Sequence, residues 1–317
     1  MTYNHVEVFN KHKILPNIKN DFCLQSQLKS CLDIDDVLID IANVIIPDIS
    51  KKFLAKDFKF ELNLDSYERK DFVKDINAKI AKNYKSENNF PLTPETLRAM
   101  IKYCSIFSES SKDSTRVKVL NLINKHFSIN QPPINIKNLS EDSSWWLTAL
   151  KCLLRIFIYE LNKKDCEWIR NNIDFLSDLL LITHNYYEFN DIISTSKIFP
   201  NQQFDLCIGT DLKIGNNISE KLKDLYDNIF KNNSDTSKYP IRKFLIHNNF
   251  KDFLPHKEEK TSESLGQEIE SLLKIQDNTN INQSPYIKHI LEIIKLISDN
   301  PEWKKYFPIA VDRKSVV

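Results

Sequence analysis

The chain is almost without glycine. Three of its 317 residues are glycine, namely Gly209, Gly215 and Gly266, where average usage predicts about 22. Glycine is the residue that takes positive φ without strain and lets a phosphate approach the backbone closely. The sequence accordingly contains no G-x-G-x-x-G, no G-x-x-x-x-G-K-[ST] and no G-x-S-x-G. The usual dinucleotide site, the P-loop and the hydrolase nucleophile elbow are therefore excluded in their familiar forms.

The chain also has no large excess of positive or negative charge. The 44 Lys and Arg residues nearly balance the 43 Asp and Glu residues, which leaves a net charge of +1. The total charge therefore gives no field that would hold nucleic acid non-specifically. The six cysteines form no C-x-x-C pair, and most of them stand among apolar neighbours, so we expect reduced cysteines in the core of a cytosolic protein. Neither a metal nor a cofactor is expected.

Long hydrophobic runs are missing as well. The N-terminal residues include no apolar run of the signal-peptide type. The most apolar stretch, residues 145–161, is interrupted by Lys151, Arg155 and Glu160. Because it is too short and too charged to cross a bilayer, it predicts a helix buried in the centre of a cytoplasmic protein with no membrane partner.

Helical signals dominate what is present. Thr93 and Pro94 supply a cap and a first-turn proline ahead of an apolar repeat. Asp65 and Glu68 form a capping-box pattern ahead of a second periodic segment, 66–84. Further helices are expected at 36–46, 114–127, 144–162, 165–187, 218–231, 263–275 and 285–298. The sequence therefore predicts an all-α fold, either a multi-helix bundle or an irregular helical-repeat array.

The segments between these helices use Asn, Asp, Ser and Pro to turn the chain. The longest of them, 128–144, predicts a division into an N-terminal helical unit, 1–130, and a C-terminal helical unit, 131–317. Two short apolar runs around Gly209 allow at most one small β-hairpin, near 203–216. No convincing sequence repeat is expected, although helix pairs in solenoids can diverge while keeping only their periodicity.

One short motif points to chemistry. Arg242 and His247 are separated by four residues in an apolar segment that starts just after Pro240, where we expect a helix. The motif resembles the R-x4–6-H motif of HEPN ribonucleases, an all-α family, although Lys243 stands where a small polar residue is common. The resemblance implies a metal-independent ribonuclease whose motif pairs across a dimer interface. Arg242 would stabilise phosphate charge, and His247 would move the proton of the attacking 2′-hydroxyl.

Other polar groups have a chemical and a structural interpretation side by side. Asp33, Asp35, Asp36 and Asp40 supply oxygen ligands of the kind that hold Mg²⁺, but acids at the start of a helix also complement its dipole. For Arg242 and His247, the structural alternative is an ordinary helix with a surface arginine and a partly buried histidine.

A further pair of motifs also has a chemical and a structural interpretation. Ser194–Ser196, upstream of Glu268–Glu270, is similar to the S-T-S and E-x-E elements of ADP-ribosyltransferases, a strand-rich fold. Here the E-x-E pattern is expected within a helix.

No dense polar constellation resembles a complete active site. The leading prediction is therefore a non-enzymatic α-helical interaction or scaffold subunit of a cytosolic complex, with protein partners or self-association. The HEPN-like ribonuclease, of the toxin or phage-defence type, is the alternative. A helical protein that binds RNA or DNA without catalysis is the third possibility, and steeply salt-dependent binding would identify it.

Overall fold

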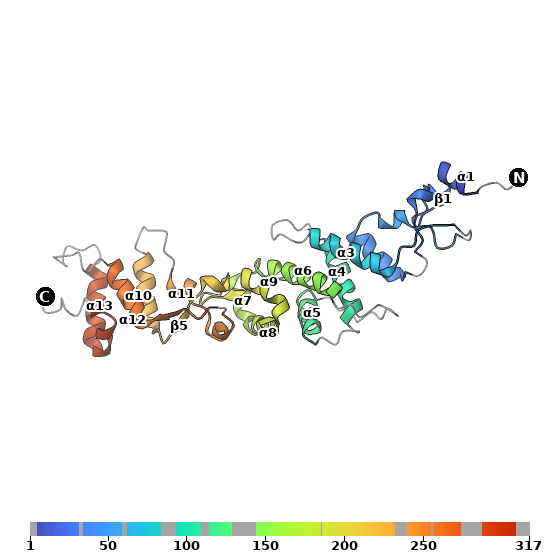
Figure 1. Ribbon diagram of the computed structural model, residues 1–317. Helices are drawn as coiled ribbons and strands as arrows, with labels where there is room; N and C mark the ends of the chain where they lie inside the picture. Colours follow the sequence, from blue (N-terminus) through green and yellow to red (C-terminus); the bar gives the residue numbers. More distant parts are fainter. Residues whose placement is uncertain are drawn as a thin grey trace. The chain divides into compact units, whose positions relative to one another are not determined.

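The computed structural model describes a predominantly helical protein with three small two-stranded sheets (Figure 1). The described residues are 5–31, 34–58, 62–83, 93–108, 114–128, 144–184, 186–231, 240–254, 256–273 and 287–308. They form two compact units, a first unit within 1–160 and a second unit within 161–317. The segment 128–144, where the sequence predicts a boundary, falls almost entirely outside the described residues.

The first unit begins with a short helix and a hairpin, and continues in helices. Its elements are α1 (His5–Lys11), β1 (Leu15–Pro16), β2 (Phe22–Cys23), η1 (Gln25–Gln27), α2 (Asp36–Ile45), η2 (Ile49–Lys52), α3 (Arg69–Asn83), α4 (Pro94–Ser108), α5 (Ser114–His126) and α6 (Ser144–Leu161), whose last residue opens the second unit.

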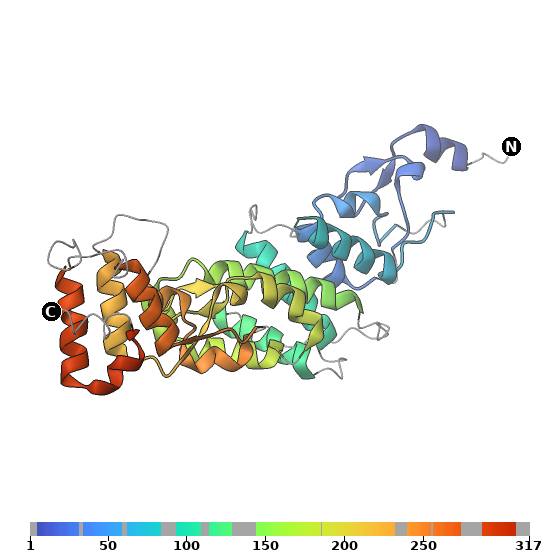
Figure 2. The same cartoon turned by 60° about the vertical axis from the view of Figure 1, so that its left-hand side comes forward.

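The second unit starts with helices and then repeats the order of hairpin and helices. Its elements are α7 (Cys166–Asn171), α8 (Ile173–His184), η3 (Tyr187–Phe189), α9 (Asn190–Thr195), β3 (Phe199–Pro200), β4 (Leu206–Cys207), η4 (Gly209–Asp211), β5 (Ile214–Asn216), α10 (Glu220–Lys231), α11 (Ile241–Phe244), η5 (Asn248–Phe253), β6 (Glu259–Thr261), α12 (Ser262–Leu272), α13 (Ile287–Asp299) and η7 (Pro301–Lys305). Figures 1 and 2 show α10, α12 and α13 side by side around one apolar core.

The helical class is confirmed, but the expectation of at most one hairpin near 203–216 is wrong. β1 pairs with β2 and β3 pairs with β4, both antiparallel, while β5 pairs in parallel with β6. The segment 203–216 does not pair with itself. Of its two strands, β4 pairs with β3 just upstream, and β5 pairs with β6 about 45 residues downstream. The parallel pair needs a long connection, which local sequence patterns do not reveal. None of the described helices is long and apolar enough to cross a membrane.

Most expected helices are present with shifted ends. Thr93 caps α4, since its hydroxyl accepts from the Thr96 N–H at 3.2 Å. The helix expected at 66–84 starts only at Arg69, because Ser66 bridges to Ser30 in an extended conformation. The helix expected at 165–187 is broken between α7 and α8.

The two units contain the same hairpin module. We use this name for residues 13–83 of the first unit and 197–273 of the second. In each, a hairpin leads through a one-turn 3-10 helix to an amphipathic helix, then to a short helical turn and a second helix. The buried faces of the first helices match position by position. These pairs are Leu38/Leu222, Ile39/Lys223, Ile41/Leu225, Ala42/Tyr226 and Ile45/Ile229. The second helices match as Phe72/Leu265, Val73/Gly266, Ile76/Ile269 and Ile80/Leu273.

A buried asparagine organises the hairpin of the first unit. The Asn17 amide donates to the Lys51 carbonyl at 3.3 Å. The Asn17 amide oxygen accepts from the backbone N–H groups of Lys19 and Asp21, each at 2.9 Å. The side chain thus holds the turn and ties it to the segment that follows α2.

Asn201 makes the same bonds in the second unit. Its amide donates to the Lys243 carbonyl at 3.2 Å, and its oxygen accepts from Gln203 and Asp205 at 2.8 and 3.0 Å. The turn residue at positive φ is Asn20 in the first hairpin and Phe204 in the second, with φ of 63° and 67°. The Arg170 guanidinium lies 4.8 Å from the Phe204 ring centroid, so packing holds a residue that rarely takes this conformation by itself.

The prediction that no sequence repeat is present is therefore wrong. When the two hairpins are aligned by their strand register, the pattern K-I-x-P-N-x3-D-x-C-x4-L-K is common to residues 13–29 and 197–213. It is hard to see in the sequence because the residues between the shared positions differ, and the two copies are separated by helices of other patterns. The shared residues include Asn17 and Asn201, which hold the turns, and Leu28 and Leu212, which are buried.

The module predicts equal effects of equivalent substitutions. Asn17→Ala and Asn201→Ala each remove a buried side chain with at least three hydrogen bonds, so each should destabilise its own unit by about 2–3 kcal/mol. Hydrogen exchange resolved by peptide locates the loss in the corresponding unit. Asn216→Ala, at an exposed asparagine bonded to Glu259, is the matched control and should change stability by less than about 0.5 kcal/mol. Unequal losses at the two sites would contradict the equivalence.

Candidate functional site

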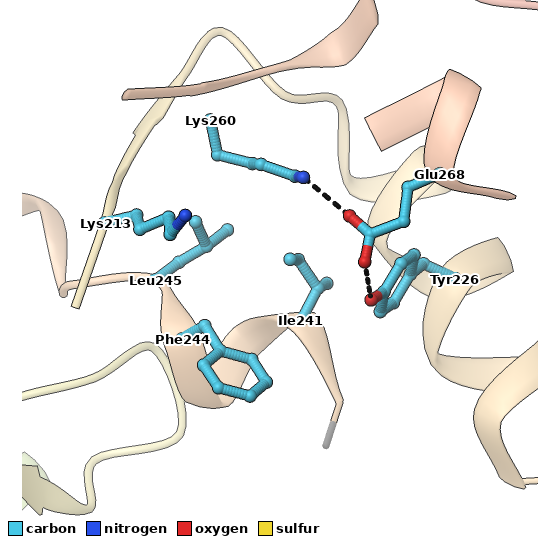
Figure 3. A pocket seen from close by; sticks show the side chains of 7 residues that line it. All are labelled: Lys213, Tyr226, Ile241, Phe244, Leu245, Lys260 and Glu268. Atoms are coloured by element: carbon cyan, nitrogen blue, oxygen red, sulfur yellow. Dashed lines mark hydrogen bonds and ion pairs between the residues drawn. The ribbon is translucent and has the colours of Figure 1, made fainter. Parts of the chain in front are cut away.

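A pocket of about 220 Å³ lies in the hairpin module of the second unit (Figure 3). Its lining combines apolar residues from α11 and the following segment with Tyr226 from α10 and with charged residues from β6, α12 and the position before β5. The lining residues are Lys213, Tyr226, Ile241, Phe244, Leu245, Lys260 and Glu268. The charges stand beside an apolar floor, which is the composition of a small binding site.

The carboxylate of Glu268 is the polar centre of the pocket. It accepts from the Tyr226 hydroxyl at 2.9 Å and pairs with the Lys260 ammonium at 2.6 Å. Burial raises the pKa of Tyr226, and the nearby Glu268 carboxylate raises it further, so the phenol stays protonated as a donor. Lys213 pairs with Glu258 at 2.7 Å, and both of these side chains are well exposed.

The equivalent place in the first unit is occupied by an aromatic ring. Tyr67 corresponds to Lys260, because Ser30 bridges to Ser66 as Ile214 pairs with Glu259. The Tyr67 ring packs on Phe53 and Phe72, with centroid distances of 5.1 and 4.8 Å. Its hydroxyl donates to Asp75, which corresponds to Glu268, and the Lys29 ammonium lies 5.3 Å from its centroid. The second unit has Leu245 in place of Phe53 and Leu265 in place of Phe72.

Arg242, one of the two residues singled out in the sequence, lies on α11 among three carboxylates. Its guanidinium donates to Asp227, Glu220 and Asp224 at 2.7, 2.7 and 2.8 Å. Burial opposes its charge, but these bonds outweigh that effect and raise the pKa of Arg242. Hydrogen bonds from Lys223 and Arg242 lower the pKa of Glu220. All three acids lie on α10, so the cluster clamps α11 to α10.

His247 has a different set of contacts. Its Nδ1 accepts from the Asn249 N–H at 3.4 Å, at the start of η5. Its ring lies 5.3 Å from the Phe204 ring and 5.9 Å from the Phe250 ring, measured between centroids. Burial lowers the pKa of His247, which favours the neutral imidazole that this cap requires.

The helix expected around the Arg242–His247 motif ends at Phe244, which corrects that expectation. The chain becomes extended because Leu245 and Ile246 bridge to Lys213 and Asn201. The side-chain contacts of Arg242 and His247 share no residue among those that the structure describes. Three carboxylates around Arg242 also oppose the approach of a phosphate. Catalysis by this pair stays a prediction.

Two residues of the acidic cluster at the start of α2 form ion pairs, and Asp40 is exposed on the helix. Asp36 pairs with Lys56 at 2.7 Å and Asp35 pairs with Arg69 at 3.2 Å, while Asp33 lies outside the described residues. Within the described part of the chain, no group of three or more His, Cys, Asp and Glu side chains is placed to hold a metal ion. Glu268, from the E-x-E pattern, lies on a helix as expected, and its carboxylate faces the pocket.

The pocket residues Lys213, Tyr226 and Lys260 carry no local sequence signal that marks them as parts of one site. The signal that could have found them is the repeated pattern, which aligns Lys213 with Lys29 and so directs attention to the positions that differ. No family model, curated protein or solved structure matches the chain. The fold and the site by themselves define a predominantly helical protein with a duplicated hairpin module and a small amphipathic pocket in the second copy.

Proposed function

We propose that the chain is a non-enzymatic interaction scaffold of the cytosol, an irregular array of helical modules that presents a surface to another protein or to a second copy of itself. The observation that carries the proposal is the duplicated hairpin module. The asparagines common to both copies hold the hairpins, while the position equivalent to Tyr67 is Lys260 in the second copy and lines a pocket. Repeated scaffolds with altered surfaces are how helical arrays acquire binding partners.

The polar groups support the same proposal through their roles in the structure. Arg242 joins two helices through carboxylates, and His247 caps the turn that follows. The pair Asp35 and Arg69 joins the start of α2 to α3. Groups that are engaged in this way contribute to a stable framework, and a reaction would have to break these contacts to use them.

The test uses the full chain. Light scattering over a concentration series measures self-association, and affinity capture from the host followed by reconstitution with the purified candidate measures partner binding. Stoichiometric assembly by either route is expected. A chain that stays monomeric and reconstitutes with no captured protein would contradict the proposal. Cleavage of single-stranded RNA that is lost in His247→Ala would overturn it in favour of catalysis.

A further inference from the structure

We propose that the pocket of the second unit binds the aromatic side chain of a tyrosine from a partner protein, seated where the first unit holds its own Tyr67. This inference rests on the proposed interaction function and names the chemistry that the partner brings. The structure supplies the template, because the bridges and backbone hydrogen bonds of the two hairpin modules match position by position around the pocket.

The second unit lacks two of the aromatic rings that fill the equivalent region of the first unit. In the first unit the region between η2 and α3 is filled by the rings of Phe53, Tyr67 and Phe72, with centroids 4.8–5.1 Å apart. The second unit has Leu245 and Lys260 at the positions of Phe53 and Tyr67. The pocket of about 220 Å³ lies beside these two residues, and its apolar floor includes Leu245.

Each unit has a lysine at the position from which it can contact an aromatic ring. The Lys29 ammonium lies 5.3 Å from the Tyr67 ring centroid, within the distance of a cation–π interaction. Lys213 is equivalent to Lys29, since their N–H groups bond to the carbonyls of Phe244 and Lys52 at 2.8 Å in the same register. Figure 3 shows Lys213 beside Leu245 at the edge of the pocket, where its ammonium pairs with Glu258. A lysine is thus placed to lie over an aromatic ring bound on the apolar floor.

Each unit also has a carboxylate that can accept the hydroxyl of a tyrosine. In the first unit Asp75 accepts the hydroxyl of Tyr67. Glu268 occupies the same turn of the equivalent helix and lines the pocket, with its oxygens directed to Tyr226 and Lys260. Since a carboxylate oxygen accepts more than one donor, the phenol of an incoming tyrosine has an acceptor at the same end as Tyr67. The pocket therefore favours a phenol over a purely aliphatic side chain.

The experiment titrates the full chain with p-cresol, the side-chain analogue of tyrosine, and follows the methyl resonances of Ile241 and Leu245. We expect saturable shifts for p-cresol and weaker binding of 4-methylcyclohexanol, which has a similar shape without a π-system. Lys213→Gln should weaken p-cresol binding by about two- to fivefold, the effect of one exposed cation–π contact. Equal affinity for the two probes, or absence of saturable shifts with p-cresol, would overturn the inference.

Two variants restore residues of the first unit. Lys260→Tyr should fill the pocket with its own ring and abolish p-cresol binding, and Leu245→Phe provides an independent variant in case the first does not fold. Tyr67→Phe, in the other unit, is the control and should leave p-cresol binding unchanged. If a folded Lys260→Tyr or Leu245→Phe chain still bound p-cresol, the proposed binding position would be refuted.

The partner assay separates the two proposals. Loss of a reconstituted partner from Lys260→Tyr, but not from Tyr67→Phe, supports the pocket as the docking site. Equal partner binding by wild type and Lys260→Tyr leaves the scaffold function in place and overturns the pocket as its site. A chain that binds p-cresol selectively but assembles with nothing supports the pocket chemistry while the scaffold function fails.

Discussion

Replacing Gly266 by alanine is expected to destabilise the second unit by about 3 kcal/mol or more, the upper range for overpacking. A Cβ at this position would lie 2.0 Å from the Tyr306 carbonyl oxygen and 2.8 Å from its carbonyl carbon. Backbone atoms cannot move aside as the end of a side chain can. Alanine normally stabilises a helix relative to glycine, so the loss must come from this contact.

Thermal unfolding measures the effect, and peptide-resolved hydrogen exchange assigns it. For a unit of this size the loss corresponds to a fall in Tm of roughly 6–12 °C. Exchange should accelerate in α12 and around Trp303, whose side chain belongs to the same core as Leu265.

Gly215→Ala is the matched control for Gly266→Ala. Its Cβ would meet a terminal methyl of Leu245 at 3.2 Å, and this glycine does not have positive φ. Because a flexible side chain can adjust, the change should stay within about 1 kcal/mol. If the Gly266→Ala and Gly215→Ala chains had the same Tm, the Tyr306 carbonyl could not lie as close to α12 as the structure places it.

Arg242→Ala is expected to cost about 3 kcal/mol or more, because it leaves the largely buried Asp227 carboxylate without its cation. Asp227 also accepts the Ile241 N–H at 2.7 Å, so it ties α10 to α11 at two points. Chemical denaturation of the wild-type and Arg242→Ala proteins measures the difference in their free energy of unfolding. The first unit has uncharged Asn43 and Ser50 at the positions of Asp227 and Arg242.

A double variant tests whether the cost comes from the stranded charge. Asp227→Asn combined with Arg242→Ser should lose less stability than Arg242→Ser alone, with a coupling of about 1–3 kcal/mol in the double-mutant cycle of these two substitutions. An additive result would contradict the role of the pair.

The same cluster should respond to pH with a definite sign. The bonds from Lys223 and Arg242 place the folded pKa of Glu220 below its ordinary value of 4.5. The stabilisation is therefore complete above pH 4.5 and is lost as the pH falls through the lower, folded value. The stability difference between wild type and Arg242→Ala should shrink in that range and stay constant near neutrality. A difference that persists unchanged in acid would exclude carboxylate pairing as its origin.

Helix positions were accessible from the sequence because their signals are local. α4 follows from the cap at Thr93, and α6 follows from the apolar stretch around Leu153. The start of α3 was misplaced because Ser66 pairs with Ser30, and no local signal reports that contact. The extended end of the Arg242–His247 segment has the same cause, since Leu245 bridges to Lys213 far back in the chain.

The candidate site was even less accessible. The sequence singled out Arg242 and His247 for their chemical types, but their neighbours decide what they do. Arg242 meets three acids on α10 and His247 caps a turn. The pocket depends on Lys213, Lys260 and Glu268, which come together only when β5 pairs with β6.

By itself, the sequence determined that this is a helical protein whose turns use little glycine. Among the described residues, the non-glycine positions with positive φ are Asn20, Asp48, Ser128, Phe204 and Asn217, and none of the three glycines has positive φ. Periodicity and capping act within a few residues, and for that reason they can be recognised along the chain. Tertiary structure decided the strand partners, the duplicated module and the pocket. These features arise from contacts between distant residues, and the packed neighbours of each residue determine whether its place is filled, as at Tyr67, or left open, as beside Lys260.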